Sequence, residues 1–109
     1  MSREEHVALS AKQLKEKCNI DADMTLLDTI AKGLGIAAMG GDASLVAGNQ
    51  ETELQTIKDS FLKGKLGLSD GDDLDGAITK VNEMLGESNP QKQRAAFYYL
   101  LAKHFNKTL

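Results

Sequence analysis

The 109-residue chain is 41% hydrophobic and 27% charged, a composition typical of one soluble globular domain. Its net charge of −3 argues against a general binder of nucleic acid or anionic membranes, because such proteins carry an excess of basic residues. The single Cys18 cannot form an internal disulfide, and no signal peptide or apolar membrane span is evident, so we expect a cytoplasmic protein.

The first predicted helix begins at Ser2, which forms a capping box with Glu5, and ends near Asn19. Its apolar stripe is narrow, so we expect this helix on the surface of a bundle. Leu9 points away from the stripe and is either simply exposed or part of a contact. The stripe consists of Val7, Ala11, Leu14 and Cys18.

A second helix is predicted after Asp21 or Asp23, each a candidate N-cap, and Gly35 is a typical residue to end it. Gly33 lies in its last turn and weakens the helix by about 1 kcal/mol relative to alanine. A close helix–helix crossing would explain this glycine, and so would a frayed helix end. The predicted inner face consists of Met24, Leu27, Ile30, Ala31 and Leu34.

The middle of the chain is predicted to contain a partly buried connector, a short turn and two further helices. The connector covers residues 36–41, and Asp42 caps a turn over residues 43–47. Asn49 caps the third long helix, in which Leu54, Ile57 and Phe61 recur at helical spacing before Gly64 or Gly67 ends it. Ser69 caps the fourth, Gly86 ends it, and its apolar face is Leu74, Ala77, Ile78, Val81, Met84 and Leu85.

The pattern of residues 89–105 predicts a helix against which the other helices of the chain pack. Asn89 is a favourable N-cap, and Pro90 suits the first helical position. The apolar arc around Phe97, Leu101 and Phe105 is broad and rich in aromatic residues, which bury the most surface per side chain. We therefore predict an all-α, single-domain bundle over residues 1–109, with about five helices and the C-terminal helix at its centre.

Three patterns resemble functional motifs, but the geometry that each motif requires is missing. Residues 33–38 (GLGIAA) match a dinucleotide fingerprint in letters, yet they follow a helix instead of a strand. The acidic stretch from Asp70 departs from a calcium loop at the fifth, sixth and twelfth positions. Residues 66–69 resemble the turn of a helix-turn-helix, but the aspartates that follow would repel DNA phosphates.

Catalytic, metal and cofactor sites are not predicted. No His/Cys cluster has metal-ligand spacing. His6 and His104 lie at opposite ends of the chain, and we interpret Cys18 as a small hydrophobic residue of the first helix instead of a nucleophile.

The candidate contact residues for a partner or ligand are Arg94, Tyr98, Tyr99, Lys103 and His104. Arg94 projects onto the apolar arc; either its head reaches water, or it is a partly buried cation that pairs with a carboxylate or an anionic ligand. Tyr99 is predicted on the opposite, polar side with Lys92 and Lys103, where it suits a protein contact or packs on a neighbouring helix.

Four segments resemble parts of a known protein family: residues 17–18 (KC), 33–35 (GLG), 61–68 (FLKGKLGL) and 96–105 (AFYYLLAKHF). The chain is similar, over nearly its whole length, to a small bacterial family catalogued only as a domain of unknown function. This resemblance implies a compact, helical, cytoplasmic bacterial protein. It supplies no catalytic residues.

The sequence does not define a biochemical activity, and two hypotheses follow from it. The first is a non-enzymatic cytoplasmic protein-interaction module that associates with itself or with another protein. The alternative is a small-ligand-binding protein or minor enzyme with a pocket near Arg94, Tyr98 and His104 of the C-terminal helix. Neither nucleic acid nor a membrane is an expected partner.

Overall fold

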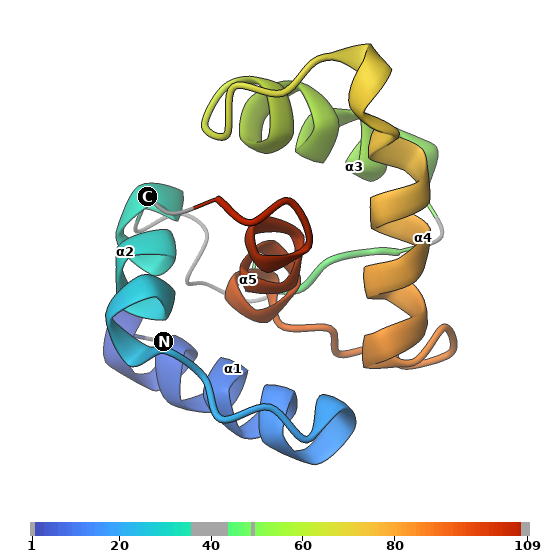
Figure 1. Ribbon diagram of the computed structural model, residues 1–109. Coiled ribbons are helices and arrows are strands. Elements are labelled where there is room, and N and C mark those ends of the chain that lie inside the picture. Colours follow the sequence, from blue (N-terminus) through green and yellow to red (C-terminus); the bar gives the residue numbers. More distant parts are fainter. Residues whose placement is uncertain (1, 36–43, 49, 108–109) are drawn as a thin grey trace.

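The computed structural model describes residues 2–35, 44–48 and 50–107, and in these ranges the chain forms helices and no strand. Figure 1 views α5 (Arg94–His104) end-on, with the other helices arranged around it. The predicted all-α bundle with a central C-terminal helix is therefore confirmed. The surrounding helices are α1 (Arg3–Cys18), α2 (Met24–Leu34), α3 (Glu51–Thr56) and α4 (Leu74–Leu85).

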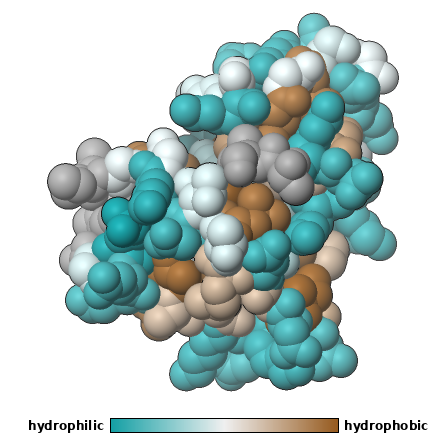
Figure 2. Space-filling model, turned by 60° about the vertical axis from the view of Figure 1, so that its left-hand side comes forward, coloured by the Kyte–Doolittle hydropathy of each residue, from teal (hydrophilic) through white to brown (hydrophobic). Residues whose placement is uncertain are grey.

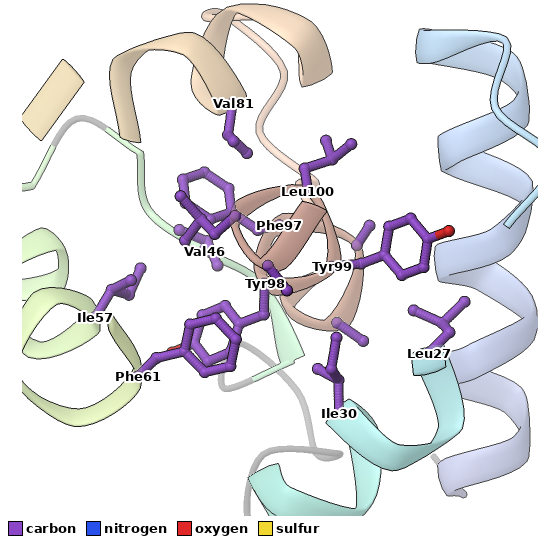
Figure 3. Packing of buried hydrophobic residues seen from close by; sticks show 14 of the residues in the cluster. Leu27, Ile30, Val46, Ile57, Phe61, Val81, Phe97, Tyr98, Tyr99 and Leu100 are labelled. Atoms are coloured by element: carbon purple, nitrogen blue, oxygen red, sulfur yellow. The ribbon is translucent and has the colours of Figure 1, made fainter. Parts of the chain in front are cut away.

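The central helix α5 is buried on all sides. Every residue from Ala95 to Ala102 is buried, and α5 contacts α1, α2 and α4. Figure 3 shows Phe97 directed toward Val81, while Tyr98 lies against Phe61. A helix that is apolar around its whole circumference belongs in a protein core, and the position of α5 follows from this composition.

The ends of α1 and α2 lie at predicted residues, but only half of the predicted capping box at Ser2 forms, since the Glu5 carboxylate accepts the Ser2 hydroxyl instead of the Ser2 N–H. The Ser2 hydroxyl accepts the Glu5 N–H at 3.1 Å, and Asn19 ends α1 in the left-handed conformation (φ 55°). The Asp23 carboxylate accepts the N–H groups at the start of α2, and Gly35 (φ 81°) follows its last residue. These caps satisfy backbone groups that have no partner within a helix.

The predicted inner faces of these two helices hold with one exception. Val7, Leu14, Leu27 and Ile30 are buried, whereas Leu9 is exposed. Met24 is also exposed, at 49%, so its predicted place on the inner face is wrong. It is the first residue of α2, and the helix packs through Leu26, Leu27, Ile30 and Ala31 instead.

The third helix continues as predicted but changes its winding. After α3 the chain enters the π-helix η3 (Ile57–Lys63), which ends in wide turns such as the Leu66 N–H bond to the Phe61 carbonyl at 2.9 Å. An alanine Cβ at Gly64 would lie 2.5 Å from the Ser60 carbonyl oxygen, so the exit from η3 requires glycine. Gln50 occupies the N-cap of α3, and Asn49 lies outside the described residues.

Ser69 caps a single 3-10 turn, and the predicted long helix from Ser69 is wrong at its start. This turn, η4 (Asp70–Asp72), has a capping box in which the Asp72 carboxylate accepts the Ser69 N–H at 2.8 Å. Asp73 then adopts φ 53°, which interrupts the helical path. α4 begins at Leu74, capped by Asp73, and Gly86 ends it as predicted.

The predicted start of the last helix at Asn89 and Pro90 is also wrong, because α5 begins at Arg94. Residues 89–93 are held by long-range bonds instead of helical ones. Gln93 forms an isolated antiparallel bridge with Leu45, and its N–H bonds to the Gln13 side chain at 2.8 Å. The Asn89 carboxamide caps a local turn at Gln91.

The predicted connector over residues 36–41 and the capping Asp42 lie outside the described residues. Of the predicted turn over residues 43–47, Ser44 lies in a 3-10 turn, whereas Leu45 and Val46 pair with residues 92–93. The Val46 N–H bonds to the Lys92 carbonyl at 2.9 Å. This pairing is formed between segments far apart in the sequence, so local turn chemistry did not reveal it.

Candidate functional site

Arg94 lies at the start of α5 and ties three parts of the fold together. Its guanidinium pairs with the Glu53 carboxylate of α3, and it donates to the Leu45 carbonyl at 2.9 Å and to the Tyr98 hydroxyl at 3.1 Å. The Arg94 side chain is 13% exposed and that of Glu53 is 22% exposed. The interpretation of Arg94 as a partly buried cation paired with a carboxylate is therefore confirmed.

A pocket of about 370 Å³ lies beside Tyr98, between α2, η3 and α5. Its size falls in the range of small-molecule sites. The Tyr98 ring packs on the Phe61 ring with centroids 4.3 Å apart, and Figure 3 shows both rings together near Ile30. The described lining residues are Thr29, Ile30, Gly33, Leu34, Ser60, Phe61, Lys65 and Tyr98.

Figure 2 shows the side of the molecule on which α2 lies, and hydrophobic surface is visible there between hydrophilic segments.

Burial raises the pKa of Tyr98, and the Arg94 charge only partly opposes this effect, so the phenol stays protonated at neutral pH. The pocket therefore offers apolar and aromatic walls and neutral hydroxyl groups.

Gly33 lines this pocket without a side chain. Among the described residues, a Cβ atom at this position would meet no atom within 4 Å, so no described helix crosses closely enough to explain the glycine. Gly33 is the second-to-last residue of α2, which agrees with the alternative of a weak helix end, and alanine there would give a more stable helix by up to about 1 kcal/mol. The chain thus carries a helix-weakening residue in the lining of the pocket, where an added Cβ would meet no described neighbour.

The polar groups at the pocket differ in whether they already form a hydrogen bond or an ion pair within the protein. Thr29 donates its hydroxyl to the Thr25 carbonyl at 2.9 Å. Among the described residues, the Ser60 hydroxyl has no hydrogen-bond partner, and the Lys65 ammonium has no ion pair. The neighbouring Lys63, by contrast, pairs with Asp70 at 2.7 Å and with Asp59 at 3.8 Å.

Two of the five predicted contact residues meet at this site, and three lie elsewhere. Tyr98 lines the pocket, and Arg94 donates a hydrogen bond to the Tyr98 hydroxyl. His104 is exposed at the far end of α5, about 15 Å along the axis from Arg94, and it packs edge-on against Phe105. The expected pocket shared by Arg94, Tyr98 and His104 is therefore not formed as predicted.

Of the two alternatives for Tyr99, the structure supports packing against neighbouring segments, and the exposed protein contact is wrong. Its side chain is 2% exposed, and its hydroxyl accepts the Asp23 N–H at 2.9 Å, in the link between α1 and α2. Lys103 is exposed, with its ammonium 5.7 Å from the Tyr99 ring centroid. Lys92 is buried and donates to the carbonyls of Glu87 and Asn89. The helical wheel predicted an exposed polar face for α5, but other segments of the chain pack against this face as well.

His6 is a buried group that the sequence analysis missed. It is fully buried on α1, and its Nε2 accepts the Ala95 N–H at 3.1 Å. Nδ1 of His6 has no partner among the described residues, and the same holds for the Ser10 hydroxyl one turn later. Burial, together with the nearby Arg94 charge, lowers the pKa of His6.

This environment predicts that the protein loses stability in mild acid. The unfolded chain protonates His6 as the pH falls through about 6.5, whereas the folded state resists protonation, so the unfolding free energy decreases toward low pH. We expect urea denaturation to give a lower unfolding free energy at pH 5 than at pH 7. His6→Gln should abolish most of this difference, and His104→Gln should retain it. An equal pH dependence in His6→Gln would contradict this environment.

A second, polar cleft of about 460 Å³ lies between α1 and residues 89–93, and Gln13 bridges it by bonds to the Gln91 carbonyl and the Gln93 N–H.

Cys18 is half-buried, and its thiol contacts the Met84 carbonyl at 3.5 Å. Within the described ranges, no three His, Cys, Asp or Glu side chains are placed to hold a metal ion. No described helix is long and apolar enough to cross a bilayer.

Comparison with known proteins gives a family without an assigned activity. Residues 10–109 match the sequence profile of the family described as "Protein of unknown function (DUF2853)". No curated protein matches the chain.

Proposed function

Since the chain belongs to this DUF2853 family of unknown function, we propose its role from the pocket itself: it is a non-catalytic binding protein for a small, largely apolar molecule. The molecule is held between α2, η3 and α5. The observation that carries the proposal is Gly33, a helix-weakening residue that lines the pocket and has empty space at its Cβ position.

The composition of the lining supports binding in preference to catalysis. Ile30, Leu34, Phe61 and the Tyr98 ring supply apolar and aromatic walls, and a few polar groups supplement them, which is the usual make-up of a small-molecule site. The described lining residues include no histidine, cysteine or carboxylate that could transfer protons or attack a substrate. The π-helix at the wall fits this proposal, because such turns are frequent at functional sites.

Filling the pocket from Gly33 tests the proposal. We expect the protein to bind the neutral apolar dye N-phenyl-1-naphthylamine, and Gly33→Leu to weaken binding by about tenfold or more, because the new side chain occupies the pocket. The measurement is a fluorescence titration.

Gly33→Ala is the matched control, since it adds one methyl group, and it should raise the unfolding free energy by about 0.5–1 kcal/mol. Both variants should keep the wild-type circular dichroism spectrum. Dye binding that is unchanged in Gly33→Leu, or absent in the wild-type protein, would contradict the proposal.

A protein-interaction module is the second candidate. It is supported by two large hydrophobic side chains that are exposed, Leu9 at 42% and Met24 at 49%, and by the exposed Lys103. Tyr99 no longer supports it, because this side chain is buried. Size-exclusion chromatography with light scattering tests self-association, and a monomer at all concentrations would argue against it.

The proposal places the protein in the bacterial cytoplasm. The support is the lone Cys18, which has no second cysteine in this sequence to form a disulfide, together with the resemblance to a bacterial family. Fractionation of the host cell tests the location.

A further inference from the structure

We infer that the ligand is an amphipathic monoanion, an apolar body with one carboxylate, and that Lys65 binds the carboxylate. This inference rests on the proposed function, since it specifies the chemical class of the molecule in the same pocket. The apolar body lies against Ile30, Leu34 and the Tyr98 ring, and the carboxylate lies at the edge formed by η3 and the residues that follow it.

The distribution of charge around η3 singles out Lys65. Lys58 pairs with Asp75 at 2.8 Å, and Lys63 pairs with Asp59 and Asp70. On the other side of the pocket, Lys32 of α2 pairs with Asp28 at 3.7 Å. Lys65 lines the pocket and has no ion pair among the described residues, so its charge is available to a ligand.

The remaining polar group on the same side supports an anionic acceptor. Ser60 belongs to η3, lines the pocket and has a hydroxyl without a partner among the described residues, so it can donate a hydrogen bond. The Thr29 hydroxyl on α2 already donates to the Thr25 carbonyl. The polar donors are thus grouped at η3, whereas the α2 side is formed mainly by Ile30, Gly33 and Leu34.

A single charge is the best match for this edge. One lysine and one hydroxyl suit a carboxylate, whereas recognition of a phosphate commonly uses an arginine fork or several backbone N–H groups. The described lining includes no arginine, and Arg94, which donates to the Tyr98 hydroxyl, is also engaged with Glu53 and the Leu45 carbonyl.

Three ligands with the same ten-carbon chain test the inference: decanoate, decanol and decylamine. Each is titrated by calorimetry into the wild-type protein at low salt. We expect decanoate to bind most tightly and decylamine most weakly. Lys65→Met should weaken decanoate binding by about three- to fivefold, the range for a solvent-accessible ion pair, and leave decanol binding unchanged. Higher salt should reduce the preference for decanoate.

Lys80→Met is the matched control, because Lys80 is an exposed lysine of α4 that does not line the pocket and has no ion pair among the described residues. It should bind decanoate like the wild-type protein. If decanol binds as tightly as decanoate and Lys65→Met has no effect, the carboxylate inference is overturned and the proposed apolar site stands. If none of the three ligands binds and the neutral dye does not bind either, both are overturned.

Discussion

Replacing Phe97 with alanine should lower the unfolding free energy by about 4 kcal/mol, the largest effect that we expect from a single core substitution. Phe97 is fully buried on the central helix, and Figure 3 shows its ring on the side of α5 that faces Val46 and Val81. The loss combines the removed apolar surface with the cavity that remains. Small domains are stable by about 5–15 kcal/mol, so the change is a large part of the total.

Urea denaturation followed by circular dichroism measures this loss. Leu9→Ala is the control, because Leu9 is exposed on α1, and its effect should stay within about 0.5 kcal/mol. Similar losses in the two variants would mean that α5 is not the centre of the core.

Arg94→Met should cost about 2–3 kcal/mol, the second large effect. The substitution leaves the Glu53 carboxylate without its cation and removes the donor to the Leu45 carbonyl and to the Tyr98 hydroxyl. Breaking one side of a largely buried pair is costly because the remaining charge stays poorly solvated. Denaturation at neutral pH measures the loss.

A surface pair provides the comparison for Arg94. Arg3 and Asp28 form an ion pair at 3.2 Å, but their side chains are 45% and 40% exposed, so Arg3→Met should cost less than about 1 kcal/mol. The double variant Arg94→Met/Glu53→Met should recover part of the loss, since it removes both charges. Equal losses in Arg94→Met and Arg3→Met would contradict the role of Arg94 as the tie between α3 and α5.

Helix caps and helix ends that depend only on neighbouring residues were predicted correctly from the sequence. The caps at Ser2 and Asp23 and the helix ends at Gly35 and Gly86 depend on residues within one turn, and all of them formed as predicted. The start of α5 depends on bonds from Gln13 and residues 45–46, which are far away in the sequence. A favourable N-cap residue at position 89 could not reveal that competition.

The candidate site was predictable only on the central helix. The aromatic arc drew attention to Arg94 and Tyr98, and both are at the site. The remaining walls come from α2 and η3, whose placement relative to α5 is a property of the assembled fold. Gly33 was visible in the sequence, but a glycine in the last turn of a helix fits a weak helix end as well and did not predict a pocket.

Tyr99 shows the limit of the helical wheel. The wheel separates apolar and polar faces, but it cannot show that neighbours surround a helix on all sides. The phenol of Tyr99 is buried because its hydroxyl bonds to the Asp23 N–H, which is 76 positions away along the chain. An amphipathic side chain of this kind fits either surface, and only the fold decides between them.

The central claim is that the pocket bounded by Gly33, Ser60 and Lys65 binds a small apolar molecule, and an NMR titration of the amide signals tests it most directly. With N-phenyl-1-naphthylamine added to saturation, we predict that the largest shifts occur at residues 29–34 and 60–65 and disappear in Gly33→Leu. Shifts confined to the polar cleft, at residues 12–17 and 89–93, or no shifts at all would contradict the claim.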